Sequence, residues 1–299
     1  MPDDQHKLLV DTDIGTDIDD AACLAYLLNQ PNCDLVGITT VTGEAVKRAK
    51  LADALCRVLG AEEVPIHAGT ESPLLVPQTQ TSAPQGEVLD NWDHKPVLEP
   101  NTAVDFMRRA IRKYPGEITL LTIGPLTNVG LLFALDPQVP QLLDRLVMMG
   151  GCFNREENET NASTDPHSTE IVYRADIDDL LVVSLDVTLQ CSTNPHEAKK
   201  IFGAEEHQLI REMAEVWFEK RNHLVFHDPL AAAVIFEPEL CTYQSGEAKV
   251  ELCEEGRVGL TSWTPSEGQE KGHKIATTVD EKAFFSHYRE VVGQGNRSD

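Results

Sequence analysis

The feature of the sequence that most suggests chemistry is a cluster of five aspartates within ten residues. They follow a short apolar run and precede a helical pattern, and they are Asp11, Asp13, Asp17, Asp19 and Asp20. In an α/β sheet, ligands bind at the carboxyl ends of the strands. These carboxylates would repel one another, and several would have to stay protonated, unless a cation neutralised them. Oxygen-only ligands favour Ca²⁺ or Mg²⁺ over zinc, so the cluster predicts a hard-cation site, with a solvated helix-capping loop as the plain alternative.

Two other motifs share this opening. An EF-hand loop that began at Asp11 would need glycine at Thr16 and glutamate at Ala22, so this motif is rejected. Phosphatases of the haloacid dehalogenase type also have Asp-x-Asp after a strand, but they expect Thr or Val where this chain has Gly15. They also need a later lysine and a further acidic motif, for which the sequence offers no convincing candidate. This alternative predicts Mg²⁺-dependent phosphate release through Asp11.

Alternating strand and helix patterns are expected to position the cluster. Predicted strands span 8–10, 35–41, 64–67, 118–123, 146–149 and 180–185, and predicted helices span 21–29, 44–59, 101–114, 127–135 and 166–175. The strands are almost continuously apolar, as when helices cover both faces of a parallel sheet. The pattern predicts an α/β fold with a doubly wound, mainly parallel central sheet flanked by helices.

The pattern changes after residue 188. Three further helices are predicted over 195–202, 205–222 and 229–236, and segments 248–252 and 274–279 predict a small C-terminal hairpin addition. Segment 78–94 is polar and contains proline, which predicts a long surface loop, either a flexible lid or a plain solvated loop. We expect one domain over residues 1–299, since α/β chains of this length often form a single domain.

Composition limits the partners. The formal net charge is −24, which disfavours nucleic acid but not an uncharged nucleoside. The seven cysteines include no CxxC pair, which fits reduced thiols in the cytoplasm. The polar, acidic residues 1–5 do not resemble a signal peptide, and no apolar stretch is long enough to span a bilayer. We therefore expect a cytoplasmic protein without a membrane partner.

Six segments, in order, resemble those of the inosine–uridine-preferring nucleoside hydrolase family. The aspartate cluster resembles its N-terminal calcium signature, and the other segments are 37–43, 124–128, 148–151, 159–166 and 227–231. The resemblance covers about residues 8 to 235. It implies a calcium-dependent enzyme that hydrolyses the N-glycosidic bond between a base and its ribose.

The resemblance also implies the ligands of the calcium ion. Asp13 matches the aspartate that binds Ca²⁺ and activates water, and Asp20 matches one that binds through both carboxylate oxygens. The backbone carbonyl of Ile123, just before the Gly-Pro-Leu-Thr-Asn segment, is the third ligand. Asp228 of the His-Asp-Pro segment is the fourth.

Sugar-binding residues follow from the same resemblance. Asp19 is expected to accept a hydrogen bond from a ribose hydroxyl, and Glu159 and Asn161 match the ribose-binding pair. Met148 or Met149 is expected to line the sugar pocket. Family members form dimers or tetramers, so a homo-oligomer is expected.

The chain departs from the family pattern in four places. Glu44 stands where the family usually has an asparagine, and a carboxylate accepts hydrogen bonds but cannot donate as an amide does. Thr16 and Asp17 lengthen the opening motif by two residues. The asparagine expected ahead of the Glu-x-Asn pair has Asn154 as its candidate. A His-Gly segment that often contacts the base has no clear match, so base preference stays open.

Breaking an N-glycosidic bond develops positive charge on the ribose ring, as in glycoside hydrolysis. Asp13 is the expected base for water, and direct attack by that water would invert the anomeric carbon. His227 is the candidate acid for the departing base, and the alternative is a packed histidine. Trp92 and His94 in the polar loop, and Trp217, are candidates for contact with the base.

Three functions remain open from the sequence. The first is hydrolysis of purine or pyrimidine ribonucleosides. The second is hydrolysis of another N-ribosyl compound, such as nicotinamide riboside, which Glu44 and the unmatched loop suggest. The third is a riboside-binding protein that keeps the metal without turnover, which the presence of Asp13 and Asp228 disfavours.

Overall fold

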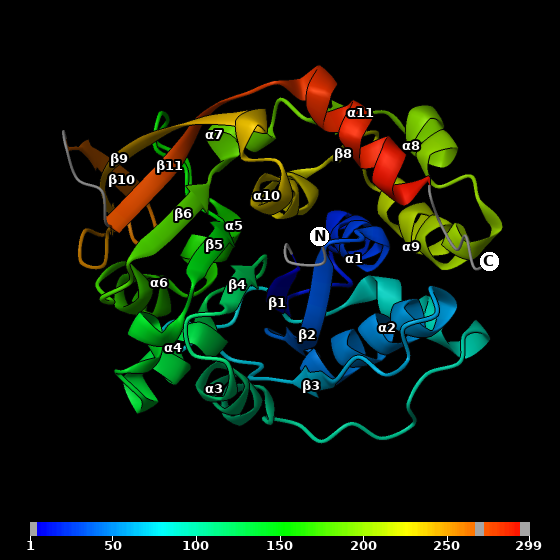
Figure 1. Ribbon diagram of the computed structural model, residues 1–299, viewed down its shortest axis with the longest axis horizontal. Helices are drawn as coiled ribbons and strands as arrows, with labels where there is room; N and C mark the ends of the chain where they lie inside the picture. The colour runs from blue at the N-terminus through cyan, green and yellow to red at the C-terminus, as the bar shows by residue number, and fades with distance from the viewer. Residues whose placement is uncertain (1–4, 267–271, 294–299) are drawn as a thin grey trace.

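The computed structural model describes residues 5–266 and 272–293. Within these ranges the chain folds around a nine-stranded sheet with the order β10-β9-β11-β6-β5-β4-β1-β2-β3 (Figure 1). Its strands are β1 (His6–Thr12), β2 (Cys33–Thr40), β3 (Ile66–Ala68), β4 (Ile118–Thr122), β5 (Arg145–Met149), β6 (Asp179–Val183), β9 (Cys241–Val250), β10 (Thr261–Pro265) and β11 (Gly272–Val279). A separate two-stranded sheet pairs β7 (Ser192–Thr193) with β8 (Leu224–Val225).

The sheet is mainly parallel, which confirms the predicted fold class. Strand β1 lies between β4 and β2, parallel to both, and β5, β6 and β11 continue the parallel part. The C-terminal addition is larger than the predicted hairpin. The predicted segment 248–252 overlaps the end of β9 and segment 274–279 lies in β11; these two strands pair antiparallel, while β10 pairs with the outer edge of β9. Because β11 also pairs with β6, the addition extends the central sheet.

Helices cover both faces of the sheet. They are α1 (Asp19–Asn29), α2 (Ala45–Val58), α3 (Ala103–Lys113), α4 (Thr127–Leu135), α5 (Thr160–Thr164), α6 (Pro166–Tyr173), α7 (Leu185–Thr188), α8 (Pro195–Ile201), α9 (Gln208–Phe218), α10 (His227–Phe236) and α11 (Glu281–Val292). Short 3-10 segments are η1 (Pro84–Asn91), η2 (Val139–Leu142), η3 (Glu205–His207) and η4 (Pro238–Leu240). In the described ranges, no helix combines the length and apolar character needed to cross a lipid bilayer.

Alternate residues of the central strands β1, β4, β5 and β6 pack into two separate cores. In β1, Leu8 and Val10 join the core that contains side chains of α1, α2, α10 and α11, whereas Leu9 joins the core of α3, α4 and α6. All three side chains are completely buried. This alternation follows from the pleat of the strand, and burial on both faces explains why the strand is continuously apolar.

Helix α11 was not predicted from the sequence. The Asp280 side chain caps it by accepting a hydrogen bond from the Ala283 backbone N–H at 3.0 Å. Its apolar face packs against α1 and α10, and the Tyr288 hydroxyl donates to the Ala22 carbonyl at 2.9 Å. Helix α11 therefore supports helix α1, whose first two residues belong to the aspartate cluster.

The polar segment 78–94 is more closely packed than the predicted surface loop. Its 3-10 segment η1 contacts α2 and α9. Gln85 is completely buried and donates to the Thr16 carbonyl at 3.2 Å. Trp92 donates through its indole nitrogen to Glu212 at 2.7 Å. These contacts hold the segment beside the aspartate loop.

Candidate active site

A cavity of about 270 Å³ lies where β1, β4 and β5 end at the carboxyl edge of the sheet. The residues around it come from loops and helices spread over most of the chain. They are Asp13, Thr16, Asp17, Asp19, Asp20, Gln80, Ile123, Met149, Glu159, Thr160, Asn161, Leu185, Trp217, Arg221, His227 and Asp228. The position is the one at which open α/β sheets bind ligands. Carboxylate residues, Trp217 and His227 therefore line one cavity.

Three aspartates form the tightest acidic group in the cavity. Carboxylate oxygens of Asp19, Asp20 and Asp228 lie within 4.8 Å of one another, and all three residues are buried. The backbone N–H of Asp228 donates to Asp19 Oδ2 at 3.2 Å, and the Thr12 hydroxyl donates to Asp20 Oδ1 at 2.5 Å. Burial, followed by the negative charges of Asp19 and Asp20, raises the pKa of Asp228 well above its usual range. A buried, oxygen-only group of this kind fits a hard divalent cation.

The pairing of α1 with α10 brings these aspartates together, although Asp19 and Asp228 are 209 residues apart in the sequence. Asp19 and Asp20 occupy the first turn of α1, and Asp228 occupies the first turn of α10. The two helices pack against each other on one face of the sheet (Figure 1). Three carboxylates at two helix N-termini also face the positive ends of the helix dipoles, which favours their charged forms.

Asp13 lies on the loop between β1 and α1 and reaches the same cavity. Its carboxylate accepts a hydrogen bond from Gln80 Nε2 at 2.5 Å. The completely buried Arg48 donates to the backbone carbonyls of Asp13 and, at 3.1 Å, Ile14. Gly124 is required opposite, because a Cβ there would lie 2.9 Å from the Asp13 backbone nitrogen. The loop is therefore fixed on two sides, and Asp13 is held beside the carboxyl end of β4.

Glu159 and Asn161 occupy the side of the cavity next to β4 and β5. The Asn161 amide donates to the carbonyls of Ile123 at 3.0 Å and Met149 at 3.2 Å. Glu159 caps α5, since its carboxylate accepts from the backbone N–H groups of Asn161 at 2.7 Å and Ala162 at 2.8 Å. Both side chains are buried, so their orientation is set by these bonds. The predicted ribose-binding pair and the predicted carbonyl ligand thus lie together.

The sequence left open whether Met148 or Met149 lines the sugar pocket, and the positions of the two side chains differ. Met149 lines the cavity, whereas Met148 packs in the core of α3, α4 and α6 on the other face of the sheet. Consecutive residues of a strand point to opposite faces, so only one of the two can face the site. The family motif identified the strand segment that borders the cavity, but it did not show which of the two methionines faces the cavity.

Two further predicted contacts lie outside the cavity. Glu44 instead accepts from the Ala83 backbone N–H at 2.8 Å and pairs with Lys47, so it fastens segment 78–94 to the start of α2. Asn154 is exposed, and its backbone N–H donates to Asp186 at 3.2 Å. The structure therefore does not bring these two side chains to the predicted sugar site.

The lining of the cavity also includes His227, Trp217 and Arg221. The His227 Nδ1 atom lies 2.7 Å from the Thr188 hydroxyl, and burial lowers the pKa of His227 to about 4. The Arg221 guanidinium carbon lies 5.5 Å from the centre of the Trp217 ring. Sequence reasoning missed Arg221, Gln80 and Leu185, because no local pattern distinguishes them from surface or core residues. Trp92 and His94 are not among the lining residues, since the indole of Trp92 faces Glu212.

Asp11 is placed away from the cavity. Its Oδ1 accepts from the Thr39 hydroxyl at 2.5 Å and from the Asn128 amide at 2.8 Å, and the side chain is completely buried. Burial raises the pKa of Asp11 to about 7. The phosphatase alternative needs this carboxylate as an accessible nucleophile, and the structure therefore argues against it.

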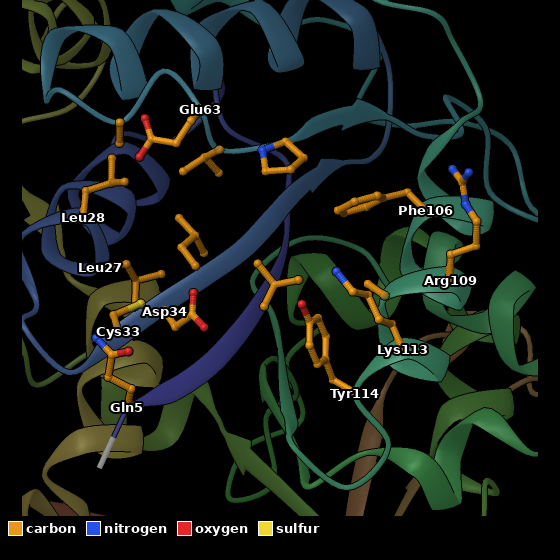
Figure 2. Close-up of a pocket in the computed structure, with 16 residues that line it drawn as sticks. Gln5, Leu27, Leu28, Cys33, Asp34, Glu63, Phe106, Arg109, Lys113 and Tyr114 are labelled. Atoms are coloured by element: carbon orange, nitrogen blue, oxygen red, sulfur yellow. The ribbon is translucent and has the colours of Figure 1, made fainter. Parts of the chain in front are cut away.

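A larger cavity, of about 790 Å³, lies at the amino ends of β1 and β2 (Figure 2). Figure 2 shows Phe106, Arg109, Lys113 and Tyr114 of the α3 region on one wall, opposite Leu27 and Leu28 of α1. The tight carboxylate group does not belong to its lining. Size alone would favour this cavity, but the smaller one holds the groups that can bind a metal or move a proton, so we take it as the candidate active site.

Sequence comparison supports the same assignment. A profile of the family described as inosine-uridine preferring nucleoside hydrolase matches residues 8–286. The non-specific ribonucleoside hydrolase RihC of Salmonella enteritidis is 32% identical over 95% of this chain and 96% of its own length. The probable uridine nucleosidase 1 of rice (Oryza sativa subsp. japonica) is 30% identical over 96% of both chains.

Solved structures agree in fold. A purine-preferring ribonucleoside hydrolase from Gardnerella vaginalis superposes with a TM-score of 0.83 at 24% identity, covering 96% of this chain and 98% of that one. A plant nucleoside hydrolase gives a TM-score of 0.82 at 23% identity, with the same coverage. Together with the aspartates gathered at the carboxyl edge of the sheet, the match over nearly the whole length shows that this chain belongs to the inosine-uridine preferring nucleoside hydrolase family.

Proposed function

We propose that the chain hydrolyses the N-glycosidic bond of ribonucleosides, releasing the free base and ribose, with Ca²⁺ as its cofactor. The observation that carries the proposal is the convergence of Asp19, Asp20 and Asp228, from both ends of the chain, with Asp13 on the wall of the same cavity. The names of the two sequence relatives, a uridine nucleosidase and a non-specific ribonucleoside hydrolase, support the substrate class.

The donor set fits calcium. Asp13, Asp20, Asp228 and Ile123 all line the cavity, and the three carboxylates and the Ile123 carbonyl oxygen would hold the ion, with Asp19 beside them. The Ile123 oxygen also accepts a hydrogen bond from the Asn161 amide at 3.0 Å. All these donors are oxygens, and the crowded carboxylates need a positive charge. When bound, the ion supplies a fixed position for water and for the vicinal hydroxyls of ribose.

The side chains of this protein then have separate tasks. Asp13 accepts a proton from the attacking water, and the Gln80 amide at 2.5 Å holds the carboxylate in place for that transfer. Glu159 and Asn161, on the side of the cavity next to β4 and β5, bind ribose hydroxyls. The ring develops positive charge in the transition state, and the surrounding carboxylates stabilise that charge. Fixed positioning of this kind can lower the barrier by roughly 7–11 kcal/mol at best.

His227 is the proposed proton donor to the departing base. It lines the cavity together with Trp217 and Arg221. When the Thr188 hydroxyl donates to Nδ1, the ring N–H lies on Nε2 and can donate a hydrogen bond to the departing base. Transfer of a proton to that base requires the imidazolium form, in which both ring nitrogens carry a hydrogen. The Trp217 ring offers a surface on which a planar base can stack.

A second candidate substrate is a positively charged N-ribosyl compound such as nicotinamide riboside. The acidic residues that line the cavity outnumber the one arginine among them, Arg221, so the cavity attracts cations. A cationic base leaves as a neutral molecule, which reduces the need for an acid. A protein that binds ribosides without turnover is the third alternative.

A panel of ribosides, assayed for release of free ribose with Ca²⁺ and with a chelator, tests the proposal. We expect purine or pyrimidine ribonucleosides to be hydrolysed only with Ca²⁺, and Asp13→Ala to abolish turnover while keeping the protein folded. Faster release from nicotinamide riboside than from any nucleoside would favour the second candidate. Binding of ribosides without release of any nucleobase would favour the third alternative, a binding protein. A wild-type rate for Asp13→Ala would exclude Asp13 as the general base.

A further inference from the structure

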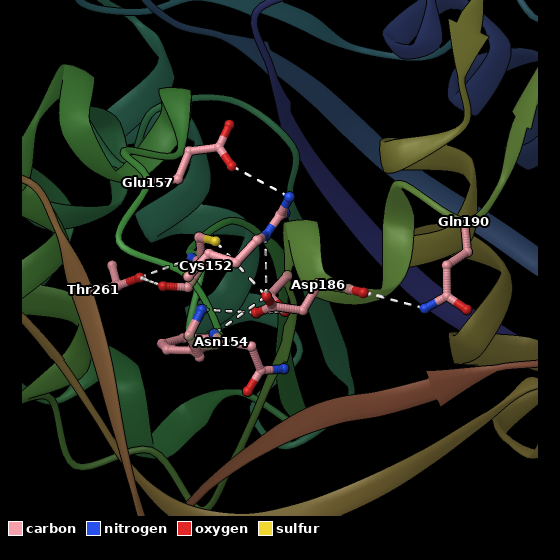
Figure 3. Close-up of polar contacts among 9 residues, drawn as sticks. Cys152, Asn154, Glu157, Asp186, Gln190 and Thr261 are labelled. Carbon is pink, nitrogen blue, oxygen red and sulfur yellow. Dashed lines mark hydrogen bonds and ion pairs between the residues drawn. The ribbon is translucent and has the colours of Figure 1, made fainter.

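A polar cluster outside the cavity fixes the segment that leads to Glu159. Residues 150–159 connect β5 to α5, and their first half lies against the start of α7 (Figure 3). The Asp186 carboxylate accepts from the backbone N–H groups of Phe153 at 2.7 Å and Asn154 at 3.2 Å. It also accepts from the Ser184 hydroxyl at 3.1 Å. One carboxylate thus holds two consecutive backbone groups of the segment.

The C-terminal strands hold the same segment from the other side. The Thr261 hydroxyl on β10 accepts from the Cys152 backbone N–H at 2.8 Å and donates to the Cys152 carbonyl at 2.9 Å (Figure 3). Asp186 is only 7% exposed, and Arg155 lies 4.0 Å from its carboxylate. Hydrogen bonds to a charged, poorly hydrated carboxylate are stronger than those between neutral groups.

Gly151 connects the segment held by Asp186 and Thr261 to Glu159 in the active site. Its backbone N–H donates to Glu159 Oε2 at 2.9 Å, and its carbonyl accepts from the Leu185 backbone N–H at 3.0 Å. Gly151 has a φ of +77°, a conformation that favours glycine. Glu159 Oε2 also accepts from the Ala162 N–H of α5, so a shift of Gly151 would turn the carboxylate relative to the cavity.

We propose that Asp186 is a positioning residue for the sugar-binding Glu159. Asp186 is not among the lining residues of the cavity, although the preceding Leu185 is. It acts by holding segment 151–154 against α7, so that the Gly151 N–H meets Glu159 at the angle that ribose binding requires. This role rests on the proposed function, because it assumes that Glu159 binds a ribose hydroxyl.

The test compares Asp186→Ala and Asp186→Asn with the matched control Asp136→Asn. Asp136 is also a buried carboxylate, held by Arg108 and Arg112, but it lies at the far end of α4 from the site. Two readouts are measured in the full-length protein: KM and kcat for a hydrolysed riboside, and hydrogen exchange of the backbone amides of Gly151 and Ala162.

For Asp186→Ala we expect KM to rise about tenfold, which corresponds to about 1.4 kcal/mol of binding free energy, with a smaller change in kcat. Both amides should exchange faster. Asp186→Asn should fall between the wild type and Asp186→Ala, because its amide oxygen can still accept one backbone bond. The control should change neither readout. Thr261→Val, which removes the contact on the other side, should shift both readouts in the same direction.

An unchanged KM and wild-type exchange in Asp186→Ala would overturn the inference. An equal rise of KM in Asp136→Asn would also overturn it, since the effect would then be general destabilisation. If the wild type hydrolyses no riboside, the proposed function fails, and the exchange of the Gly151 and Ala162 amides still decides whether Asp186 positions Glu159. If Asp186→Ala does not fold, Asp186→Asn and Thr261→Val give the same two readouts.

Discussion

Replacing Asp228 by asparagine should separate two opposite effects of a carboxylate in the active-site cavity. Oxygens of Asp228, Asp19 and Asp20 lie within 4.8 Å of one another, and all three side chains are buried. Without a cation, each negative charge destabilises the others. With a cation, Asp20 and Asp228 are proposed ligands, and the positive charge of the ion also offsets the repulsion from Asp19. Asp228→Asn should therefore stabilise the metal-free protein and remove most of the stabilisation that Ca²⁺ provides.

The size of both effects can be worked out. Two unit charges 4.8 Å apart repel by about 3.5 kcal/mol at an effective dielectric constant of about 20. Burial raises the pKa of Asp228, so partial protonation already relieves part of this repulsion, and we expect a gain of about 1 kcal/mol in the metal-free protein. Ca²⁺ at one hundred times its Kd should add about 2.7 kcal/mol to the wild type.

Urea unfolding, measured with excess Ca²⁺ and with a chelator, checks this prediction. Asp17→Asn is the matched control, because Asp17 lines the cavity but lies outside the group of three carboxylates. The control should keep the calcium-dependent gain in unfolding free energy. The reasoning is refuted if Asp228→Asn keeps the full gain, or if it is less stable than the wild type in the presence of chelator.

Three further predictions follow from single side chains. Arg48→Met should lower the free energy of unfolding by about 3 kcal/mol, because the buried guanidinium bonds several backbone carbonyls; a loss below about 1 kcal/mol in urea unfolding would contradict this. His227→Ala should slow ribosides with poor leaving groups more than activated ones, and equal losses in kcat/KM on both would exclude it as the acid. Hydrogen bonds from Arg112 and Arg108 hold the pKa of Asp136 below its usual range, so this carboxylate contributes stability above about pH 4 that is lost as the pH falls toward its lower, folded-state pKa. Asp136→Asn should therefore weaken the acid-side loss of stability, and unfolding curves between about pH 5 and pH 2 that match the wild type would argue against this role.

Local patterns in the sequence determined the α/β class and the position of the aspartate cluster. Continuous apolar runs predict strands that are buried on both faces, and β1 is such a strand. The cluster at its end then had to lie at the carboxyl edge of the sheet. The motif resemblance predicted that Asp228 belongs to the same site, although Asp228 lies more than two hundred residues from the cluster in the sequence. The strands and helices depend on the preferences of residues close together in the sequence, and each motif of the resemblance can be identified from its own short segment.

Only the tertiary structure decided which side chains complete the site. Met149 rather than Met148 faces the cavity because of the strand register, and Glu44 turns to Ala83 because segment 78–94 packs beside it. Gln80 and Arg221 reach the cavity from elements that no local pattern places there. Helix α11 and the contact of Asp186 with segment 151–154 likewise depend on chain segments distant in sequence. The direction of a side chain depends on what packs against it, and the packing partner lies elsewhere in the chain.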